Sequence, residues 1–233
     1  MNVRAGTSGW SYKEWKGHFY PEKISPKDML RFYAEHFGTV EVNNTFYRMP
    51  KPEVIEGWAA EVPENFSFVL KASQRITHIK RLGDVADSVD YLLKGAAVLG
   101  PRLGPFLVQL PPNMKKDVPR LRAFLELLPA GTRAAFEFRN ATWYEDEVYD
   151  ALRERNQSWC VADTGEEGDP PFVATADWGY LRLRRVEYRE EDLAAWAEKV
   201  RAQSWGEAWV FFKHEDAGTG PRLAKRFLEI VNG

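Results

Sequence analysis

Short apolar runs of β-type residues alternate with amphipathic helical runs along almost the whole chain, and this alternation constrains the fold more than any other feature. The β-type runs are rich in Val, Phe, Tyr and Trp and are bounded by Gly, Pro or Asn, as is typical of strands. Eight strands are predicted, at residues 3–8, 39–43, 67–71, 105–110, 133–138, 159–163, 180–184 and 208–213.

The predicted helices lie between these strands. Apolar residues recur at helical spacing near 30–37, 92–99, 121–128, 193–200 and 223–231, with shorter runs near 54–58 and 148–152. Ahead of the first run, Ser25 is predicted to be the N-cap and Pro26 the first helical residue. The stretch 164–179 contains Pro170-Pro171 and no helical period, so we expect a loop there instead of a helix.

Strands that alternate with helices form parallel sheets, which are either open and doubly wound or closed into a barrel. Three features favour the barrel: the eight strands, the absence of a Gly-x-Gly-x-x-Gly motif, and a length of 233 residues, near the roughly 250 typical of this fold. We therefore predict one domain, residues 1–233, that forms an eight-stranded parallel (β/α)8 TIM barrel. In it, a loop replaces the helix after the sixth strand.

Composition excludes several classes of protein. Apolar residues make up 44% of the chain, enough for a core, and the single Cys160 excludes an internal disulfide. The 32 Lys and Arg nearly balance the 34 Asp and Glu, and the net charge of −2 disfavours a nucleic-acid coat or a polybasic membrane anchor. Because no apolar run could span a bilayer and no signal peptide precedes the first strand, we expect a cytoplasmic protein without a membrane partner.

Polar residues stand near the carboxyl end of almost every predicted strand, where TIM barrels place their active sites. Strands covered by helices normally consist of continuous apolar runs, so this set needs an explanation. Side chains two residues apart share a face of a strand, which places Glu41 with Asn43 and Glu137 with Arg139. The whole set is Thr7, Ser8, Glu41, Asn43, Lys71, Gln109, Glu137, Arg139, Asp163, Arg182, Arg184, Lys213 and His214.

Two interpretations of this set remain open. The charges could form an ion-pair ring that plugs the barrel, because buried charges are tolerated when they are paired. We favour a site for an anionic ligand, since arginine forks suit phosphate and carboxylate and a carboxylate in a partly dry mouth can act as acid or base. The predicted roles are acid–base catalysis by Glu41 or Glu137, anion binding by Lys71, Arg139, Arg182 and Lys213, and orientation of the ligand by Asn43, Gln109 and Asp163.

Other chemistry has less support in the sequence. A desolvated Lys71 could form a Schiff base, and Glu137 with Asp163 could be the carboxylate pair of a glycosidase. A divalent metal is a further candidate cofactor, with His78 and His214 as its weak candidate ligands, although no metal-binding spacing is present. The glycine-rich turn 216–221 before the last helix could hold an anion, but Asp216 opposes it.

Aromatic residues are concentrated early in the chain. Trp10 and Tyr12 follow the end of the first strand, and Tyr47 follows the second. One or two of these three could contact a sugar or a base in the ligand. Most of the other aromatic residues are expected to pack in the core.

Several segments, taken together, resemble the YecE-like family (domain of unknown function 72), a TIM-barrel family without an assigned reaction. The resemblance runs in order along nearly the whole chain and implies the TIM-barrel fold. The matching segments are Gly6-Thr7-Ser8-Gly9-Trp10-Ser11-Tyr12, Phe19-Tyr20-Pro21, Val40-Glu41-Val42-Asn43-Asn44-Thr45-Phe46-Tyr47-Arg48, Ile76-Thr77-His78, Gln109-Leu110-Pro111-Pro112, Glu137-Phe138-Arg139 and Ala162-Asp163-Thr164. The chain departs from the family pattern at Arg184-Arg185, where His-Gly is expected, and at Lys213-His214, where Asn-Asn is common.

Three functional hypotheses follow. The first is an enzyme, of hydrolase or of lyase or isomerase type, that acts on a small phosphorylated or sugar-containing anion by acid–base chemistry. The second is a nucleic-acid-binding or metal-dependent nuclease-like barrel with a basic rim at Lys80-Arg81 and Arg184-Arg185, which the net charge disfavours. The third is a barrel that binds its ligand without changing it.

Overall fold

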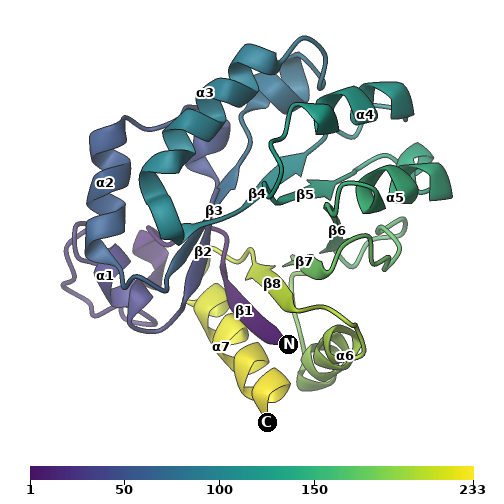
Figure 1. The fold of residues 1–233 in the computed structure, drawn as a ribbon. Helices are drawn as coiled ribbons and strands as arrows, with labels where there is room; N and C mark the ends of the chain where they lie inside the picture. The colour runs from purple at the N-terminus through teal and green to yellow at the C-terminus, as the bar shows by residue number, and fades with distance from the viewer.

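The computed structural model describes all 233 residues and has eight parallel strands arranged as a barrel with helices around it (Figure 1). Every predicted strand is present, and no strand end differs from the prediction by more than two residues. The strands are β1 (Asn2–Thr7), β2 (Thr39–Val42), β3 (Ser67–Lys71), β4 (Leu103–Gln109), β5 (Ala134–Glu137), β6 (Ser158–Asp163), β7 (Trp178–Leu183) and β8 (Glu207–Phe212).

Helices connect the strands, except between β6 and β7, where the predicted loop is confirmed. The α-helices are α1 (Met29–Ala34), α2 (Pro52–Glu61), α3 (Ala86–Ala96), α4 (Val118–Glu126), α5 (Asp146–Arg153), α6 (Glu190–Arg201) and α7 (Thr219–Asn232). None of these helices combines the length and apolar composition needed to cross a membrane.

The predicted start of the first helix is wrong. Helix α1 begins at Met29, and the residue at its N-cap position is Asp28. Ser25 instead belongs to a turn, in which its carbonyl accepts from the Asp28 backbone N–H and its hydroxyl donates to the Asp28 carboxylate at 2.7 Å. The turn satisfies Ser25 locally, so neither Ser25 nor Pro26 starts the helix.

A tyrosine bridges the seam where the first strand meets the second. Strands β1 and β2 share only one bridge, between Ser8 and Glu41, whereas all other neighbouring strands form ladders. At this seam the Tyr33 hydroxyl accepts from the Thr7 backbone N–H at 2.9 Å and donates to the Thr39 carbonyl at 3.1 Å. Gly6 permits this approach, since a β-carbon there would lie 2.3 Å from the Thr39 carbonyl oxygen.

The core has two parts. The larger part, 55 buried residues, lies mainly between the strands and the surrounding helices. The smaller part fills the inside of the barrel, as expected for a fold whose interior is packed rather than open. It consists of Val69, Leu107, Ala135, Cys160, Trp178, Tyr180, Trp209 and Phe211. Polar side chains are therefore confined to the two ends of the barrel interior.

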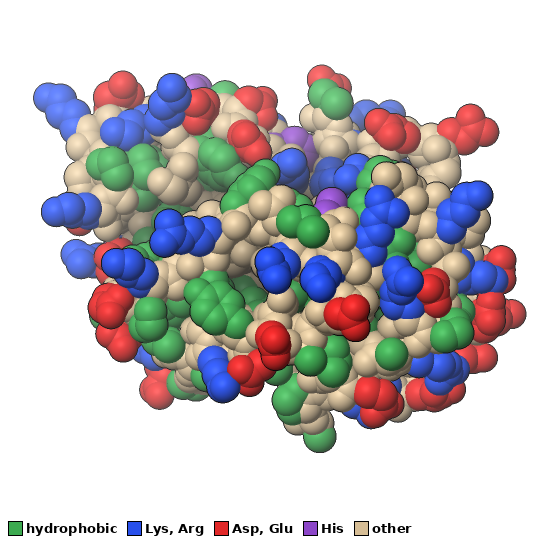
Figure 2. Space-filling view, turned by 90° about the horizontal axis from the view of Figure 1, so that it is seen from above, with side chains coloured by type: hydrophobic (Ala, Val, Ile, Leu, Met, Phe, Trp, Pro, Cys, Tyr) green, Lys and Arg blue, Asp and Glu red, His purple; other side chains and the backbone are tan.

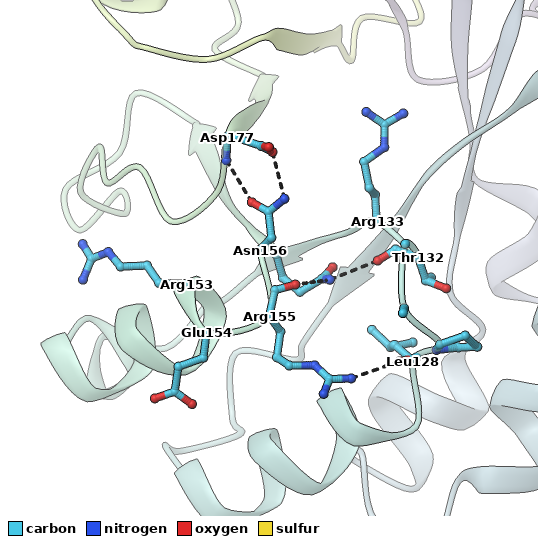
Figure 3. Close-up of a pocket in the computed structure, with 12 residues that line it drawn as sticks. Leu128, Thr132, Arg133, Arg153, Glu154, Arg155, Asn156 and Asp177 are labelled. Atoms are coloured by element: carbon cyan, nitrogen blue, oxygen red, sulfur yellow. Dashed lines mark hydrogen bonds between the residues drawn. The ribbon is translucent and has the colours of Figure 1, made fainter.

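A cavity of about 670 Å³ lies beside the amino-terminal ends of β5, β6 and β7 (Figure 3). Its polar side chains already have partners. The Asn156 and Asp177 side chains are joined at 2.9 Å, and Arg155 donates to the Leu125 and Leu128 carbonyls at 3.2 and 3.1 Å. The charged strand ends converge at the other end of the barrel, which therefore holds the candidate functional site.

Candidate active site

The centre of the candidate site is Arg182, which reaches from β7 to two glutamates on other strands. Its guanidinium donates to Glu41 on β2 at 2.8 Å and to Glu137 on β5 at 2.6 Å. All three side chains point into the barrel, and their exposed fractions are 2%, 0% and 0%. The structure thus brings together three of the predicted site residues in one buried ion-pair cluster.

Both carboxylate oxygens of Glu41 accept hydrogen bonds. The Ser8 hydroxyl donates to it at 2.7 Å, the Tyr180 hydroxyl at 2.6 Å, and the Asn43 amide at 3.2 Å. Burial alone would raise the pKa of the Glu41 carboxyl, but Arg182 and these donors outweigh burial and lower it. Glu41 is therefore an ionised carboxylate held in one orientation.

Glu137 is held in a similar way on the opposite side of Arg182. The Gln109 amide donates to it at 2.8 Å, and a second arginine, Arg184, lies 3.7 Å away. Burial would raise the pKa of the Glu137 carboxyl, but Arg182 and Arg184 lower it to about 2. Glu41 and Glu137, either of which was predicted to be the acid or base, are therefore both ionised.

Lys71, at the end of β3, differs from the other cations of the cluster because it has no carboxylate partner. Its ammonium donates to the Gln109 side-chain oxygen at 2.8 Å and lies 4.4 Å from the centre of the Phe46 ring. Burial and the charge of Arg182 lower the pKa of Lys71 to about 8. Near neutral pH, this amine can both hold and release a proton.

Two cations at the rim of the cluster lack partners, and a third is only partly satisfied. Arg139 and Lys213 are exposed and make no ion pair, and the Nε atom of Arg184 is buried without an acceptor. Arg139 and Arg184 line a cavity of about 270 Å³ that reaches Glu137. On the face drawn in Figure 2, Lys and Arg side chains gather together with His in a hollow.

Acidic residues also border this cavity, on the loop that follows β6. Glu166 and Glu167 are exposed, while the Asp169 carboxylate accepts from the Thr164 hydroxyl at 2.5 Å and from the Gly165 backbone N–H at 3.0 Å. Asp169 is therefore committed to shaping its own loop. None of these three carboxylates makes an ion pair with Arg139 or Arg184, the two arginines that line the cavity.

The three aromatic residues that were predicted to contact a ligand lie in two separate places. Tyr12 donates to the Ser8 carbonyl at 2.6 Å, and Trp10 packs edge-on against Trp58 with 5.3 Å between ring centres. Both line a small cavity of about 190 Å³ that Asn43 also borders. Tyr47 is 73% exposed and lines a separate groove of about 400 Å³.

Asp163 lies outside the cluster, contrary to the expectation that it converges with the other charges. In the β6–β7 ladder its register partner is the outward-facing Leu183, while the neighbouring Ala162 pairs with Arg182. The Asp163 carboxylate accepts from the Trp196 indole N–H at 2.8 Å and from Arg185 at 2.7 Å. It therefore anchors α6 and does not form a carboxylate pair with Glu137.

The two candidate metal ligands are also apart. His214 is 8% exposed and its Nε2 lies 2.5 Å from the Arg185 carbonyl oxygen, whereas the His78 ring packs edge-on against Phe46. No group of three His, Cys, Asp or Glu side chains in the chain has the arrangement that holds a metal ion. The two histidines thus do not belong to a common preformed ligand set.

Sequence reasoning missed Tyr180 and the roles of Ser8 and Arg184. Tyr180 lies two residues before Arg182, so strand alternation already places it on the same inward face. Ser8 follows the first strand directly, and a hydroxyl at a strand end suits a hydrogen-bond donor to the site. The contact of Arg184 with Glu137 joins residues from two strands and has no local signal.

A closed barrel of parallel strands with a charged cluster at their carboxyl ends defines the class: this is a TIM-barrel protein. Residues 4–233 match the family described as "Protein of unknown function DUF72", and the chain belongs to this family. The predicted resemblance is therefore confirmed.

Among curated proteins, the chain is 26% identical to the UPF0759 protein YunF of Bacillus subtilis, over 99% of this chain and 95% of YunF. It is 34% identical to the UPF0759 protein YecE of Escherichia coli K12 over 58% of this chain and 52% of YecE, so this match spans about half the length of that relative.

Among solved structures, a DUF72 family protein from Thermotoga maritima matches with a TM-score of 0.89 and 27% identity, and each chain is covered in full. A D-psicose 3-epimerase from Clostridium cellulolyticum has a TM-score of 0.56 and 12% identity over 98% of both chains, which shows the fold alone. The comparisons thus establish the family and the architecture.

Proposed function

We propose that the protein is an enzyme that binds a small anion, phosphorylated or carboxylated, at the carboxyl end of the barrel and transfers a proton within it. The observation that carries the proposal is the unpaired positive charge at this end. Arg139 and Lys213 have no partner, and Arg184 keeps a buried Nε without an acceptor. A buried polar donor without a partner is costly, so a ligand that supplies an acceptor would relieve that cost.

The charges that are paired support the same conclusion. Arg182 engages both Glu41 and Glu137. Of the rim cations, only Arg184 has a carboxylate nearby, that of Glu137 at 3.7 Å, so Arg139 and Lys213 remain unpaired. An anion near Arg139 and Arg184 would meet planar guanidinium groups, which bind phosphate or carboxylate through two parallel hydrogen bonds.

The geometry divides the chemical roles within the cluster. Glu41 and Glu137 are fully buried and ionised, so we assign them the role of positioning Arg182 and Gln109. The proton-transfer group in this proposal is Lys71, because its pKa of about 8 lies near neutrality and its side chain is only partly buried. Asn43 and Gln109 then orient the ligand around it.

The proposal is tested by titrating wild type and three variants with phosphorylated and carboxylated metabolites in a calorimeter. Arg139→Ala and Arg184→Ala are each expected to weaken binding at least tenfold, since each removes a charge-assisted hydrogen bond worth about 1.5–3 kcal/mol. Arg201→Ala is the matched control, because Arg201 is exposed on α6 and makes no ion pair. Unchanged binding in both rim variants would contradict the proposal.

The same proteins distinguish the two alternatives. Binding to single- or double-stranded DNA that weakens steeply with salt would favour a nucleic-acid-binding barrel. Within its proposed basic rim, Arg185 is already paired with Asp163 at 2.7 Å, which leaves fewer free cations for a phosphate backbone. Ligand binding with no turnover in product analysis would favour a non-catalytic barrel.

A further inference from the structure

Lys71 has an arrangement that ion pairing does not explain. Its side chain is half-buried at the mouth, yet no carboxylate lies within 4.0 Å of its nitrogen, although two carboxylates belong to the same cluster. The flat face of Phe46 lies on its ammonium at 4.4 Å. The amine is thus kept within the site without a counterion.

Gln109 is the reason that the amine stays unpaired. Its amide nitrogen donates to Glu137 at 2.8 Å, which turns its oxygen toward Lys71 at 2.8 Å. Gln109 therefore stands between the lysine and the nearest carboxylate. The strand end that carries Lys71 is fixed as well, because the Thr45 hydroxyl donates to the Lys71 carbonyl at 2.8 Å.

Charges of both signs face this amine, and among them Arg182 has the largest effect. Arg182 on β7 and Lys213 after β8 disfavour protonation of Lys71, while Glu41 on β2 and Glu137 on β5 favour it. Burial is the largest effect, and together these groups lower the pKa of Lys71 to about 8. A substantial fraction of the amine is therefore uncharged, and hence nucleophilic, in mildly alkaline solution.

We propose that Lys71 is a nucleophile that forms an imine with the carbonyl carbon of an aldehyde or ketone that also carries a phosphate or carboxylate group. The proposal deepens the proposed function and rests on it, because the rim cations hold the anionic group while Lys71 meets the carbonyl. In this proposal, the unpaired cations bind the anionic group of the substrate, and the amine without a counterion reacts with its carbonyl group.

The reaction balances without an oxidant or reductant. The nitrogen lone pair of Lys71 attacks the carbonyl carbon, and the proton lost from nitrogen goes to the carbonyl oxygen, giving a carbinolamine. The new hydroxyl group then takes a proton from solvent and leaves as water, which leaves a protonated imine. This cation withdraws electrons from the neighbouring carbon, so loss of a proton or cleavage of a carbon–carbon bond there becomes easier.

The test is reductive trapping. Wild-type protein is mixed with pyruvate, dihydroxyacetone phosphate or glyceraldehyde 3-phosphate, treated with sodium borohydride, and analysed by intact and peptide mass spectrometry. We expect one adduct per chain, on the peptide that contains Lys71, with at least one of these compounds. The expected trapping rate rises roughly 50-fold from pH 6 to pH 8, as an amine with a pKa near 8 loses its proton.

Two substitutions at Lys71 separate chemistry from folding. Lys71→Arg keeps the charge and Lys71→Met keeps the stem, and each is expected to lose the adduct while calorimetry still detects binding of the anion. Lys225→Arg, an exposed lysine on α7, is the control and should be trapped at Lys71 like wild type.

Each remaining outcome has a defined meaning. Binding of the compounds with no adduct, or with adducts spread over Lys213 and surface lysines, would overturn the imine and leave the proposed function intact. Neither binding nor an adduct with any anionic compound would overturn both.

Discussion

The two ends of the barrel interior each contain an arginine–glutamate cluster, but the two clusters are built in opposite ways. At the amino-terminal end, one carboxylate, Glu207, accepts from Arg4 and from Arg133, each at 2.7 Å. Both guanidinium groups lie over Trp209, at 5.3 and 5.6 Å from the ring centre. At the carboxyl end, one arginine, Arg182, serves two carboxylates.

The clusters also differ in contact with water. The side chains of Arg4, Arg133 and Glu207 are 25%, 38% and 18% exposed, whereas those at the other end are sealed. Arginines that stack on tryptophan at the solvent boundary close the barrel at little desolvation cost. A fully buried ion triad gains little net stability, because desolvation offsets the attraction. We therefore interpret the amino-terminal cluster as structural and the carboxyl-terminal cluster as the frame of a site.

The largest expected effect comes from removing the central cation at the carboxyl end. Arg182→Met leaves Glu41 buried without a counterion and Glu137 with only the more distant Arg184 at 3.7 Å, so we expect a loss of about 3–5 kcal/mol in the free energy of unfolding. Arg133→Met should cost about 1 kcal/mol, since Glu207 keeps Arg4 and stays in contact with water. Urea denaturation at pH 7 measures both.

Equal losses of stability in Arg182→Met and Arg133→Met would contradict the proposed difference between the two clusters. The triple variant Glu41→Gln, Glu137→Gln, Arg182→Met is the control, because it removes all three charges together. Its stability should exceed that of Arg182→Met alone, as neutralising a whole buried cluster costs less than breaking it.

The next effect is a dependence on acid pH. The folded-state pKa of Glu137 is about 2, below its ordinary value of 4.5, so the stability it contributes is complete above pH 4.5 and is lost as pH falls toward 2. Glu137→Gln should flatten this part of the stability–pH curve, and urea midpoints between pH 2 and pH 5 measure it. Glu207→Gln should flatten it less, because Glu207 is less completely buried. An unchanged curve in Glu137→Gln would show that Arg182 does not hold this carboxylate ionised.

At pH 7, the smallest expected effect on stability is at Lys71. Its pKa of about 8 lies below the ordinary 10.5, so between these values the unfolded chain binds more protons and stability rises with pH. Lys71→Met should remove this rise and change stability at pH 7 by less than about 1 kcal/mol, because the lost hydrogen bond to Gln109 offsets the removed charge. Thermal unfolding from pH 7 to pH 10.5, with Lys225→Met as control, measures it. A persistent rise would assign the effect to another group.

Much of the barrel follows from local patterns. The strand at 67–71 was predicted with its observed bounds, and the missing helix after β6 followed from Pro170-Pro171 and the lack of a helical period. The start of α1 was wrong because Ser25 has the composition of an N-cap, yet it satisfies its hydrogen bonds within a turn. Local chemistry therefore predicted which elements form better than where they begin.

At the site, the alternation of side chains along a strand was enough to predict which residues lie together, provided that only one face of the strand was polar. It placed Glu41 with Asn43, which the structure joins at 3.2 Å. On β6 both faces are buried, so the sequence offered no way to tell whether Ala162 or Asp163 points inward. The register with β7 decides it, because Asp163 faces the same side as Leu183.

By itself, the sequence determined the alternation of strands and helices, the eight-stranded barrel and the presence of charges at the strand ends. These properties depend on neighbouring residues and on the periods of strand and helix. The tertiary structure alone decided which charges are partners. Arg182 meets Glu41 across 141 positions of the chain, and Gln109 keeps Lys71 apart from Glu137. Closure of the barrel sets these contacts, because it brings the ends of distant strands to one mouth and turns alternate side chains toward it.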